Sequence, residues 1–384
     1  MRIRRTRASL VALTACTLGF LAACVPAAAA SPVRPSAAAT MPAATPATCP
    51  RVAMAAPAPA VLAAVTAISS GDAWAAGRTG GSARPVLAHW NGNSWTTVSS
   101  PALQAPGELR AVAKFAGGVW AVGTTRQTTG GSRQHLILRV TGATVHTVPI
   151  PRPSAGELLA VAATSAENAW AAGYVTARGP LILHWNGTAW KRSPLPSSAR
   201  GRIEAVATTS PGNAWAADTR NRLGSQIWHW NGTRWHRVAI PVIPGQTIFL
   251  GGVTALSATN AWAVGTAFVR ASVTLRTLIL HWNGAQWRRV RSPNPPSIDG
   301  DALDGVSASS AGNAWAVGSN TDGPSLAEHW DGTSWRAVPT HGCGSLASVA
   351  VLPSGRAWAV GAIGAQTPVI LRWNGSIWQS VPLT

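Results

Sequence analysis

"ENAWAAGYVTARGPLILHWNGTAWKRSPLP", residues 167–196, contains three tryptophans placed around short turns. An apolar run from Asn168 ends in a polar loop, a second run leads to Trp185, and a third begins at Trp190. The pair Asn186 and Gly187 between the last two runs tolerates the positive φ of a tight hairpin turn. The stretch therefore predicts consecutive antiparallel strands.

The same pattern recurs along the chain. The tryptophan of the "NAW" triplet or its equivalent occurs seven times, at intervals of 43 to 53 residues: Trp74, Trp120, Trp170, Trp215, Trp262, Trp315 and Trp358. Six copies carry a pair of further tryptophans: Trp90 and Trp95, Trp185 and Trp190, Trp230 and Trp235, Trp282 and Trp287, Trp330 and Trp335, and Trp373 and Trp378. The second copy has Val140 and Val145 there, and only Trp228 falls outside the pattern.

Each copy begins with a short β-rich run such as "LLAVAATS", which brings the unit to four strands in about 45 residues. Seven such units predict an all-β, seven-bladed β-propeller with four antiparallel strands per blade. The repeats lie near 61–106, 107–155, 156–200, 201–247, 248–300, 301–343 and 344–384. A small residue always precedes the valine of the first run, as expected where inner strands converge on an axis: Ala64, Ala111, Ala160, Ala205, Gly252, Gly305 and Ser348.

These repeats resemble those of secreted bacterial β-propellers of the Kelch-like, galactose-oxidase-central-domain-like and BNR/Asp-box-like kinds. The closest local match is "WDGTSW", Trp330–Trp335, which has nearly the spacing of an Asp-box hairpin. The chain departs from the Asp box in lacking its leading Ser or Thr, and from Kelch in lacking a recurrent diglycine. The resemblance implies a seven-bladed toroid over residues 61–384 and leaves the chemistry open.

The repeated tryptophans and histidines are predicted to be structural. An identical aromatic residue in six or seven blades suits the wedge between neighbouring blades, whereas a single binding site needs asymmetry. The alternative is a multivalent lectin whose exposed tryptophans stack on sugars. One histidine precedes the hairpin tryptophan in five blades, which spreads them around a ring instead of gathering them at a metal: His89, His184, His229, His281 and His329. We expect no metal and no cofactor.

The amino-terminal residues have the features of an export signal. "LAAC", ending at Cys24, resembles a lipobox and predicts a lipoprotein-type signal peptide over residues 1–24 with acylation of Cys24. Cleavage after Ala30 by ordinary signal peptidase is the alternative. Residues 25–60 are rich in Ala and Pro and predict an extended tether. The protein is thus expected outside the cell, secreted or lipid-anchored on the outer face of the cytoplasmic membrane.

Only Cys49 and Cys343 remain once the leader is removed. They precede the inner strands of the first and seventh repeats, which are neighbours in a closed ring. An oxidising destination permits a disulfide between them, and two unpaired thiols are the alternative.

The charge of the chain is strongly basic, with a formal net charge of +19. Without Arg2, Arg4, Arg5 and Arg7 of the leader, 27 basic residues face 12 acidic ones. Such a field favours an anionic cell-wall polymer, glycan or protein, and export argues against nucleic acid. Compositional bias is the alternative explanation. Nine arginines fall in variable loops expected on one face and are the predicted ligand-binding residues: Arg78, Arg84, Arg126, Arg133, Arg178, Arg220, Arg222, Arg270 and Arg276.

Five acidic residues lie at or just before inner strands and are candidates for the mouth of the central channel: Glu108, Glu157, Glu204, Asp301 and Asp304. The alternative is that they cap turns. Enzyme chemistry is limited by composition, since Tyr174 is the one tyrosine available for a copper radical site or a sialidase-type nucleophile. We therefore expect a non-catalytic, monomeric binding or interaction module at the cell surface. A carbohydrate-active or oxidative enzyme with its site at the channel mouth is the second hypothesis, and a multivalent lectin is the third.

Overall fold

The third repeat shows how the sequence makes one blade. In the turn before the last tryptophan, Gly187 has a φ of 95°, and Oδ1 of Asn186 accepts hydrogen bonds from two backbone N–H groups of the turn. Trp185 and Trp190 then pair across the ladder. The four runs become the antiparallel strands β9 (Gly156–Ala163), β10 (Ala169–Val175), β11 (Gly179–Trp185) and β12 (Trp190–Arg192).

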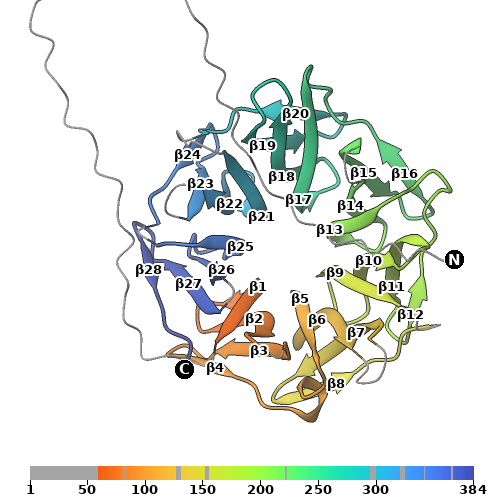
Figure 1. Cartoon of the computed structure of the whole chain (residues 1–384), viewed down its shortest axis with the longest axis vertical. Helices are drawn as coiled ribbons and strands as arrows, with labels where there is room; N and C mark the ends of the chain where they lie inside the picture. The colour runs from red at the N-terminus through yellow and green to blue at the C-terminus, as the bar shows by residue number, and fades with distance from the viewer. Residues whose placement is uncertain are drawn as a thin grey trace, which may run out of the picture. The chain divides into compact units, whose positions relative to one another are not determined.

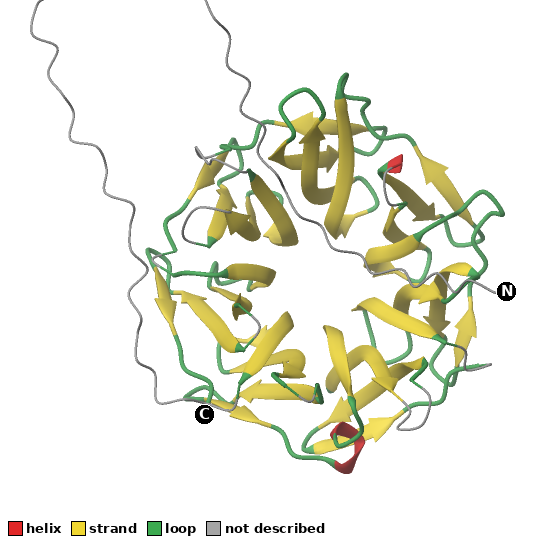
Figure 2. Cartoon of the chain, viewed as in Figure 1, coloured by secondary structure: helices red, strands yellow, loops and turns green. Residues whose placement is uncertain are grey.

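The computed structural model describes residues 59–81, 83–126, 131–151, 155–220, 223–294, 300–320, 325–340, 342–364 and 366–384, all within one structural unit. In this unit, seven sheets of four antiparallel strands surround a central channel (Figure 1), and each sheet is built from one contiguous repeat. The described residues contain almost no helix (Figure 2), apart from a short 3₁₀ helix, η1 (Pro101–Leu103), and a 3₁₀ turn at Leu223. The prediction of an all-β, seven-bladed propeller is confirmed.

Equivalent strands occupy equivalent places in the seven blades. The innermost strands are β1 (Ala60–Ser69), β5 (Gly107–Phe115), β9, β13 (Arg202–Ser210), β17 (Gln246–Ser257), β21 (Asp301–Ser310) and β25 (Ser345–Val351). The second strands are β2 (Asp72–Thr79), β6 (Gly118–Arg126), β10, β14 (Asn213–Thr219), β18 (Asn260–Val269), β22 (Asn313–Asn320) and β26 (Ala357–Ile363). The third strands are β3 (Pro85–Trp90), β7 (Arg133–Thr141), β11, β15 (Ser225–Trp230), β19 (Thr274–Trp282), β23 (Leu326–Trp330) and β27 (Thr367–Trp373). The outermost strands are β4 (Trp95–Thr97), β8 (Thr144–Thr147), β12, β16 (Trp235–Val238), β20 (Trp287–Val290), β24 (Trp335–Ala337) and β28 (Trp378–Ser380).

The innermost strands pack side by side around the channel, and β25 of the last blade contacts β1 of the first (Figure 1). Their close approach explains the small residue before each inner-strand valine. A Cβ added to Gly305 would lie 2.9 Å from the carbonyl oxygen of Ala347 in the next blade. At the equivalent place in the seventh blade, Oγ of Ser348 accepts a hydrogen bond from the backbone N–H of Val65 at 3.2 Å.

Three tryptophans meet at six of the seven blade boundaries. The ring of Trp215, on the second strand of the fourth blade, is buried and lies 5.0 Å from Trp282 and 5.2 Å from Trp287 of the fifth, between ring centroids. The first pair is tilted at 57° and the second is T-shaped at 84°. The same arrangement joins Trp358 to Trp90 and Trp95, Trp120 to Trp185 and Trp190, Trp170 to Trp230 and Trp235, Trp262 to Trp330 and Trp335, and Trp315 to Trp373 and Trp378. The tryptophans therefore fill the wedges between blades, as predicted.

The boundary between the first and second blades is the exception. There Trp74 belongs to the same buried cluster as Val140, with Val145 packed against that cluster, so aliphatic side chains replace the two partner rings. The other face of Trp74 stacks on His89 with ring centroids 4.2 Å apart. In the second and seventh blades, Arg139 and Arg372 take the place of the histidine over Trp120 and Trp358, as cation–π contacts.

The packing of Trp215 gives a direct stability test. Trp215→Ala should lower the free energy of unfolding by about 3–5 kcal/mol, because it leaves a cavity between two blades. Ile377, 48% exposed on a hairpin, is the control, and Ile377→Ala should change stability by less than about 0.5 kcal/mol. Guanidinium unfolding followed by circular dichroism measures both. A loss below about 1 kcal/mol for the tryptophan variant would show that the boundary does not depend on the ring.

The repeated run of the second strand ends in a glycine, which lies opposite a bulge in the innermost strand. The ladder of the second blade shifts register between Leu109 and Ala111, and a Cβ on Gly123 would lie 2.0 Å from the carbonyl oxygen of Glu108. No side chain fits such a gap without moving the backbone. Glycine occupies this place in six blades: Gly77, Gly123, Gly173, Gly265, Gly318 and Gly361.

The fourth blade has Asp218 at this place, and the substitution explains the one tryptophan outside the repeat pattern. Asp218 is fully buried. Its carboxylate accepts hydrogen bonds from Nε1 of Trp228 and from the backbone N–H of Gln226, both at 2.8 Å. Burial raises the pKa of Asp218, and these two hydrogen bonds oppose the rise. Trp228 therefore supplies the donor that a buried carboxyl group requires at this position.

The ring closes without a strand shared between its ends. Leu383, after β28, forms a parallel bridge with Trp95 of β4, and Thr384 donates hydrogen bonds from its backbone N–H and its hydroxyl to the carbonyl oxygen of Trp95, at 2.9 and 2.7 Å. Leu383 is buried in the cluster that contains Trp90, Trp95 and Trp358. At the start of β1, the N–H of Ala60 donates to the carbonyl oxygen of Gln366 in the seventh blade at 2.8 Å.

Leu383 is therefore expected to hold the first and seventh blades together. Leu383→Ala should lower the free energy of unfolding by about 2–5 kcal/mol, since it removes a buried side chain from the closing boundary. Ile363→Ala, at a site 46% exposed, is the matched aliphatic control. If chemical unfolding shows equal stability for the two variants, closure does not depend on this contact.

The leader, the tether, Cys24 and Cys49 lie outside the described residues. Cys343 is described just before β25, at the boundary where the ring closes. The Cys49–Cys343 disulfide and the acylation of Cys24 therefore stay predictions. Among the described residues, no helix has the length and apolar character needed to cross a membrane.

Candidate functional site

The strand register places the variable loops on one side of the propeller. In the first blade, Ala60 at the start of β1 pairs with Thr79 at the end of β2, and Arg78 pairs with Pro85 at the start of β3. The blade-to-blade connections and the loops between second and third strands therefore emerge together. This side is called the loop face below. The opposite side carries the hairpins that contain the tryptophan pairs.

The mouth of the channel on the loop face is lined by one equivalent residue from each blade. These residues, each just before the small inner-strand residue, are Ala63, Arg110, Leu159, Glu204, Gly251, Asp304 and Ala347. With side chains such as Phe249 they enclose a cavity of about 460 Å³. Asp304 is solvent-accessible at the mouth, but the protein around it partly desolvates its carboxyl group and raises its pKa to about 6. Glu204 forms an ion pair with Arg202.

Only two of the five predicted acidic residues line the channel mouth. Glu204 and Asp304 line the channel mouth, and Glu108 lines a separate pocket beside it. Glu157 and Asp301 are each 3% exposed and do not line the channel mouth. The innermost strand alternates its side chains, so neighbouring positions on one strand face different surroundings.

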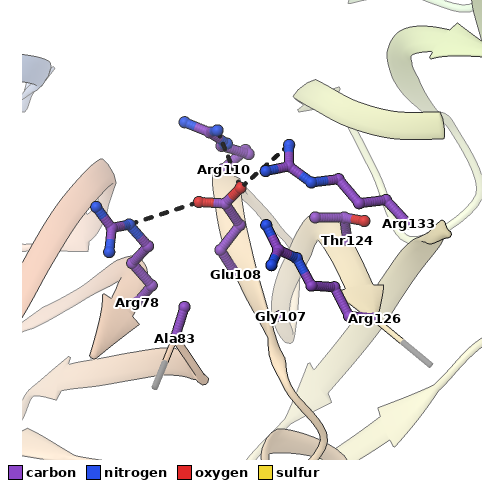
Figure 3. Close-up of a pocket in the computed structure, with 8 residues that line it drawn as sticks. All are labelled: Arg78, Ala83, Gly107, Glu108, Arg110, Thr124, Arg126 and Arg133. Carbon is purple, nitrogen blue, oxygen red and sulfur yellow. Dashed lines mark ion pairs between the residues drawn. The ribbon is translucent and has the colours of Figure 1, made fainter. Parts of the chain in front are cut away.

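The pocket beside the channel is rich in arginine. It measures about 260 Å³ and lies between the first and second blades (Figure 3). Its lining consists of Arg78, Ala83, Gly107, Glu108, Arg110, Thr124, Arg126 and Arg133. It is called the arginine pocket below. Arg78, Arg126 and Arg133 were among the predicted ligand-binding residues, whereas Arg110 was not.

The carboxylate of Glu108 is at the centre of the arginine pocket (Figure 3). Its Oε1 lies 2.9 Å from Nη2 of Arg110 and 3.9 Å from Nη1 of Arg133, and its Oε2 lies 3.6 Å from Nε of Arg78. The arginine side chains remain 32–40% exposed, while that of Glu108 is 11% exposed. The guanidinium groups therefore face solvent around an enclosed anion.

A second carboxylate supports the pocket from the third blade. Glu157 forms an ion pair with Arg133 and lies 3.8 Å from Nη2 of Arg110. The hydroxyl of Tyr174 donates a hydrogen bond to Oε1 of Glu157 at 3.0 Å. The only tyrosine of the chain thus holds a buried carboxylate and does not line the arginine pocket. A hydrogen bond to a carboxylate is also what a tyrosine nucleophile would need, so Tyr174 is separated from that role by its absence from the pocket lining and not by its contact with Glu157.

The arginine pocket keeps a positive excess. Four arginines and the two carboxylates Glu108 and Glu157 leave two positive charges uncompensated. Arg126 is in none of the ion pairs found among the described residues. Partly exposed guanidinium groups whose N–H donors lack a partner bind carboxylate, sulfate and phosphate groups through two parallel hydrogen bonds. The arrangement is therefore suited to an anionic group.

A second cavity lies between the second and third blades. It measures about 500 Å³ and is called the third-blade cavity below; its lining is His135, Ile150, Pro151, Ala155, Val175, Thr176, Arg178, Leu181, Leu183 and Arg192. Arg178 was predicted, and Arg192 on β12 was not. Nε2 of His135 donates a hydrogen bond to the carbonyl oxygen of Tyr174 at 2.9 Å. Burial lowers the pKa of His135, and Arg192 lowers it further.

The remaining predicted arginines do not join these cavities. The guanidinium group of Arg270 donates to Oγ1 of Thr247 within its own blade, at 3.0 Å from Nη2. Arg84, Arg220 and Arg276 lie elsewhere on the loop face, and Arg222 is outside the described residues.

Arg110 could have been recognised in the sequence as a site residue from its place just before the small residue of the second repeat, because that position lines the channel. Nothing in the sequence shows that it turns toward Glu108.

The histidines before the hairpin tryptophans are structural. Nε2 of each forms a hydrogen bond with the first residue of the second strand or the one before it, as in His229 to Oδ1 of Asn213 at 2.7 Å. The other four contacts are His89 to Asp72, His184 to Asn168, His281 to Asn260 and His329 to Asn313. Within the described ranges, no group of three or more His, Cys, Asp or Glu side chains is placed to hold a metal ion.

A buried acid lies at the boundary between the fifth and sixth blades. Glu328 on β23 is fully buried, and the hydroxyl of Ser292 hydrogen-bonds to its carboxyl oxygens at 2.9 Å. Burial raises the pKa of Glu328 to about 7, with a further rise from Asp301 and an opposing effect from Ser292. Asp301 is therefore part of this buried boundary.

Glu328 should make stability depend on pH. Because its pKa is raised from 4.5 to about 7 in the folded chain, the folded state holds an extra proton between these values, and stability falls as pH rises through them. Glu328→Gln should remove this decline, which is worth about 3 kcal/mol. Glu167→Gln, at an exposed site, is the control. Unfolding free energies measured from pH 4 to pH 8 test this, and parallel pH profiles for wild type and Glu328→Gln would refute it.

Comparisons with known proteins establish the fold. No protein-family model matches the chain, and no curated protein matches its sequence. The solved structure of YCF48 bound to D1 peptide is 15% identical with a TM-score of 0.54, and the match covers 83% of this chain and 93% of that one. A GH74 xyloglucanase from Xanthomonas campestris is 14% identical with a TM-score of 0.59, covering 84% of this chain and 55% of that one. A polysaccharide lyase of family PL25, an ulvan lyase bound to a saccharide, is 10% identical with a TM-score of 0.58, covering 85% and 97%.

At these identities the similarity extends to the propeller fold alone. The chain is a seven-bladed β-propeller, and an arginine-lined pocket lies beside the channel on its loop face. Its structural neighbours include a protein bound to a peptide and enzymes named for polysaccharides. Function must therefore be argued from the site.

Proposed function

We propose that this propeller is a non-catalytic binding module of the cell surface that holds an anionic polymer, glycan or protein at the arginine pocket. The observation that carries the proposal is the ring of Arg78, Arg110, Arg126 and Arg133 around Glu108, with two positive charges in excess. Guanidinium groups held by ion pairs are already oriented, so binding an anion costs little side-chain entropy.

The overall charge and the leader support the same role. Without the four leader arginines, 27 basic and 12 acidic residues give a net charge of +15, which attracts polyanions over distances of about a Debye length, roughly 8 Å at physiological salt. The export signal and the lipobox ending at Cys24 support a place outside the cell, secreted or anchored by a lipid. In this proposal the membrane is contacted only through that anchor, the chain acts as a monomer, and neither nucleic acid nor a cofactor is involved.

The tryptophans give no support to a lectin function. They are buried or partly buried at blade boundaries, and the exposed large apolar side chains of the described residues are all aliphatic: Ile68, Leu223, Val242, Val273, Ile363 and Ile377. Sugar stacking requires an exposed aromatic face. The enzymatic alternative has less support because Tyr174, although paired with Glu157, does not line the arginine pocket.

Binding of labelled poly-L-glutamate and heparin, followed by fluorescence anisotropy, tests the proposal. Arg126→Ala should weaken binding about tenfold, since a charge-assisted hydrogen bond contributes about 1.5–3 kcal/mol. Affinity should also fall as salt rises from low to physiological concentration.

The matched control is Arg234→Ala. Arg234 is exposed in the hairpin turn between β15 and β16, so the variant loses the same charge from the opposite side. Equal weakening by the two substitutions would mean that general charge drives binding, and the assignment of the arginine pocket would be wrong. No binding of either polyanion would reject the proposed function itself.

A further inference from the structure

Strand β7 contributes to the lining of both the arginine pocket and the third-blade cavity. Arg133 lines the first and His135 lines the second, and both belong to β7. Residues two apart on a strand point to the same side and are spaced by about 7 Å. Both side chains reach the third blade, Arg133 through Glu157 and His135 through the carbonyl oxygen of Tyr174.

The two cavities differ in chemistry. The arginine pocket offers guanidinium groups around Glu108, whereas Val175, Leu181 and Leu183 form a buried aliphatic wall in the third-blade cavity. Arg178 and Arg192 are exposed beside that wall. No acidic side chain is among the residues that line the third-blade cavity. The lining thus combines an aliphatic wall, against which an apolar group can pack, with basic side chains that favour a negative charge close by.

His135 adds a polar group to this surface. A carbonyl oxygen can only accept, so Nε2 of His135 carries the proton that is donated to Tyr174. Nδ1 of the neutral ring is then an acceptor, which suits an amide N–H. Apart from this imidazole, neither cavity has an aromatic ring among its lining residues, so there is no platform for stacking a sugar.

We propose that the ligand is an extended acidic segment of a protein partner, with a carboxylate in the arginine pocket and an apolar side chain two residues along the segment in the third-blade cavity. The spacing follows from the period of an extended peptide, in which alternate side chains point the same way about 7 Å apart. This inference rests on the proposed function and narrows it from anionic ligands in general to acidic peptides.

Three fluorescein-labelled peptides in one Gly/Ser background test the inference by anisotropy: one containing Asp-Ser-Phe, one Asp-Ser-Ser and one Asp-Phe-Ser. The first should bind at least about tenfold more tightly than the other two, because only it places an apolar group in the third-blade cavity. Arg126→Ala should weaken all three.

Thr176→Trp is the decisive variant, because Thr176 is exposed at the cavity and a bulky side chain there fills it without disturbing the core. It should abolish the advantage of Asp-Ser-Phe and leave the binding of Asp-Ser-Ser unchanged. Thr188→Trp, in an exposed hairpin turn on the opposite side, is the control and should change neither.

Equal affinity for the three peptides would overturn the inference, and salt-sensitive binding of poly-L-glutamate would then leave the proposed function standing. Tighter binding of an acidic oligosaccharide than of any peptide, lost in Thr176→Trp, would also overturn it, by showing that a glycan occupies the cavity. Absence of binding to every probe would reject both the inference and the function on which it rests.

Discussion

Each blade is fixed to the next by a tryptophan that packs on the hairpin of its neighbour. A ring such as Trp215 is large and rigid, and it meets one tilted and one perpendicular partner across the boundary. This geometry sets the angle between blades, because a displacement of either sheet would separate rings held about 5 Å apart. The histidine or arginine over the other face of each ring, and the glycine at the bulge, follow from the same need for close packing. Nineteen of the twenty tryptophans occupy the positions of this repeated contact, and Trp228, the partner of Asp218, is the exception.

A scaffold fixed in this way leaves its loop face free to vary. The second blade departs most from the repeat, with Val140 and Val145 in place of two tryptophans. The same blade supplies Glu108, Arg110, Arg126 and Arg133 to the arginine pocket. The structural features recur in most blades, while the charged cluster occurs once, and this asymmetry supports the proposal that the cluster binds the ligand.

The repeat pattern was sufficient to predict the fold. The repeated tryptophans, hairpin glycines and small inner-strand residues make contacts within one blade or between equivalent positions of adjacent blades, and these contacts recur around the ring. The pairing of Asp218 with Trp228 and the closure by Leu383 occur once, so no repeat reveals them. Both contacts can be recognised only in the three-dimensional structure.

The site was predicted in part. Loop arginines were expected on one face, and three of them meet in the arginine pocket. The sequence could not show that Arg133 reaches Glu157 of the next blade, because such a contact depends on the angle between blades. It also could not separate Glu204 and Asp304, which face the channel, from Asp301, which is buried beside Glu328. Neighbouring positions of inner strands look alike in sequence and differ in surroundings.

The central claim is that the tryptophans build the ring while the loop face of the first three blades binds the ligand. Hydrogen–deuterium exchange with and without poly-L-glutamate tests it most directly. The account predicts slower exchange at the ends of β2 and β6 and the start of β7, with no change in the tryptophan hairpins between third and outermost strands. Protection of those hairpins, or equal protection in all seven blades, would contradict it.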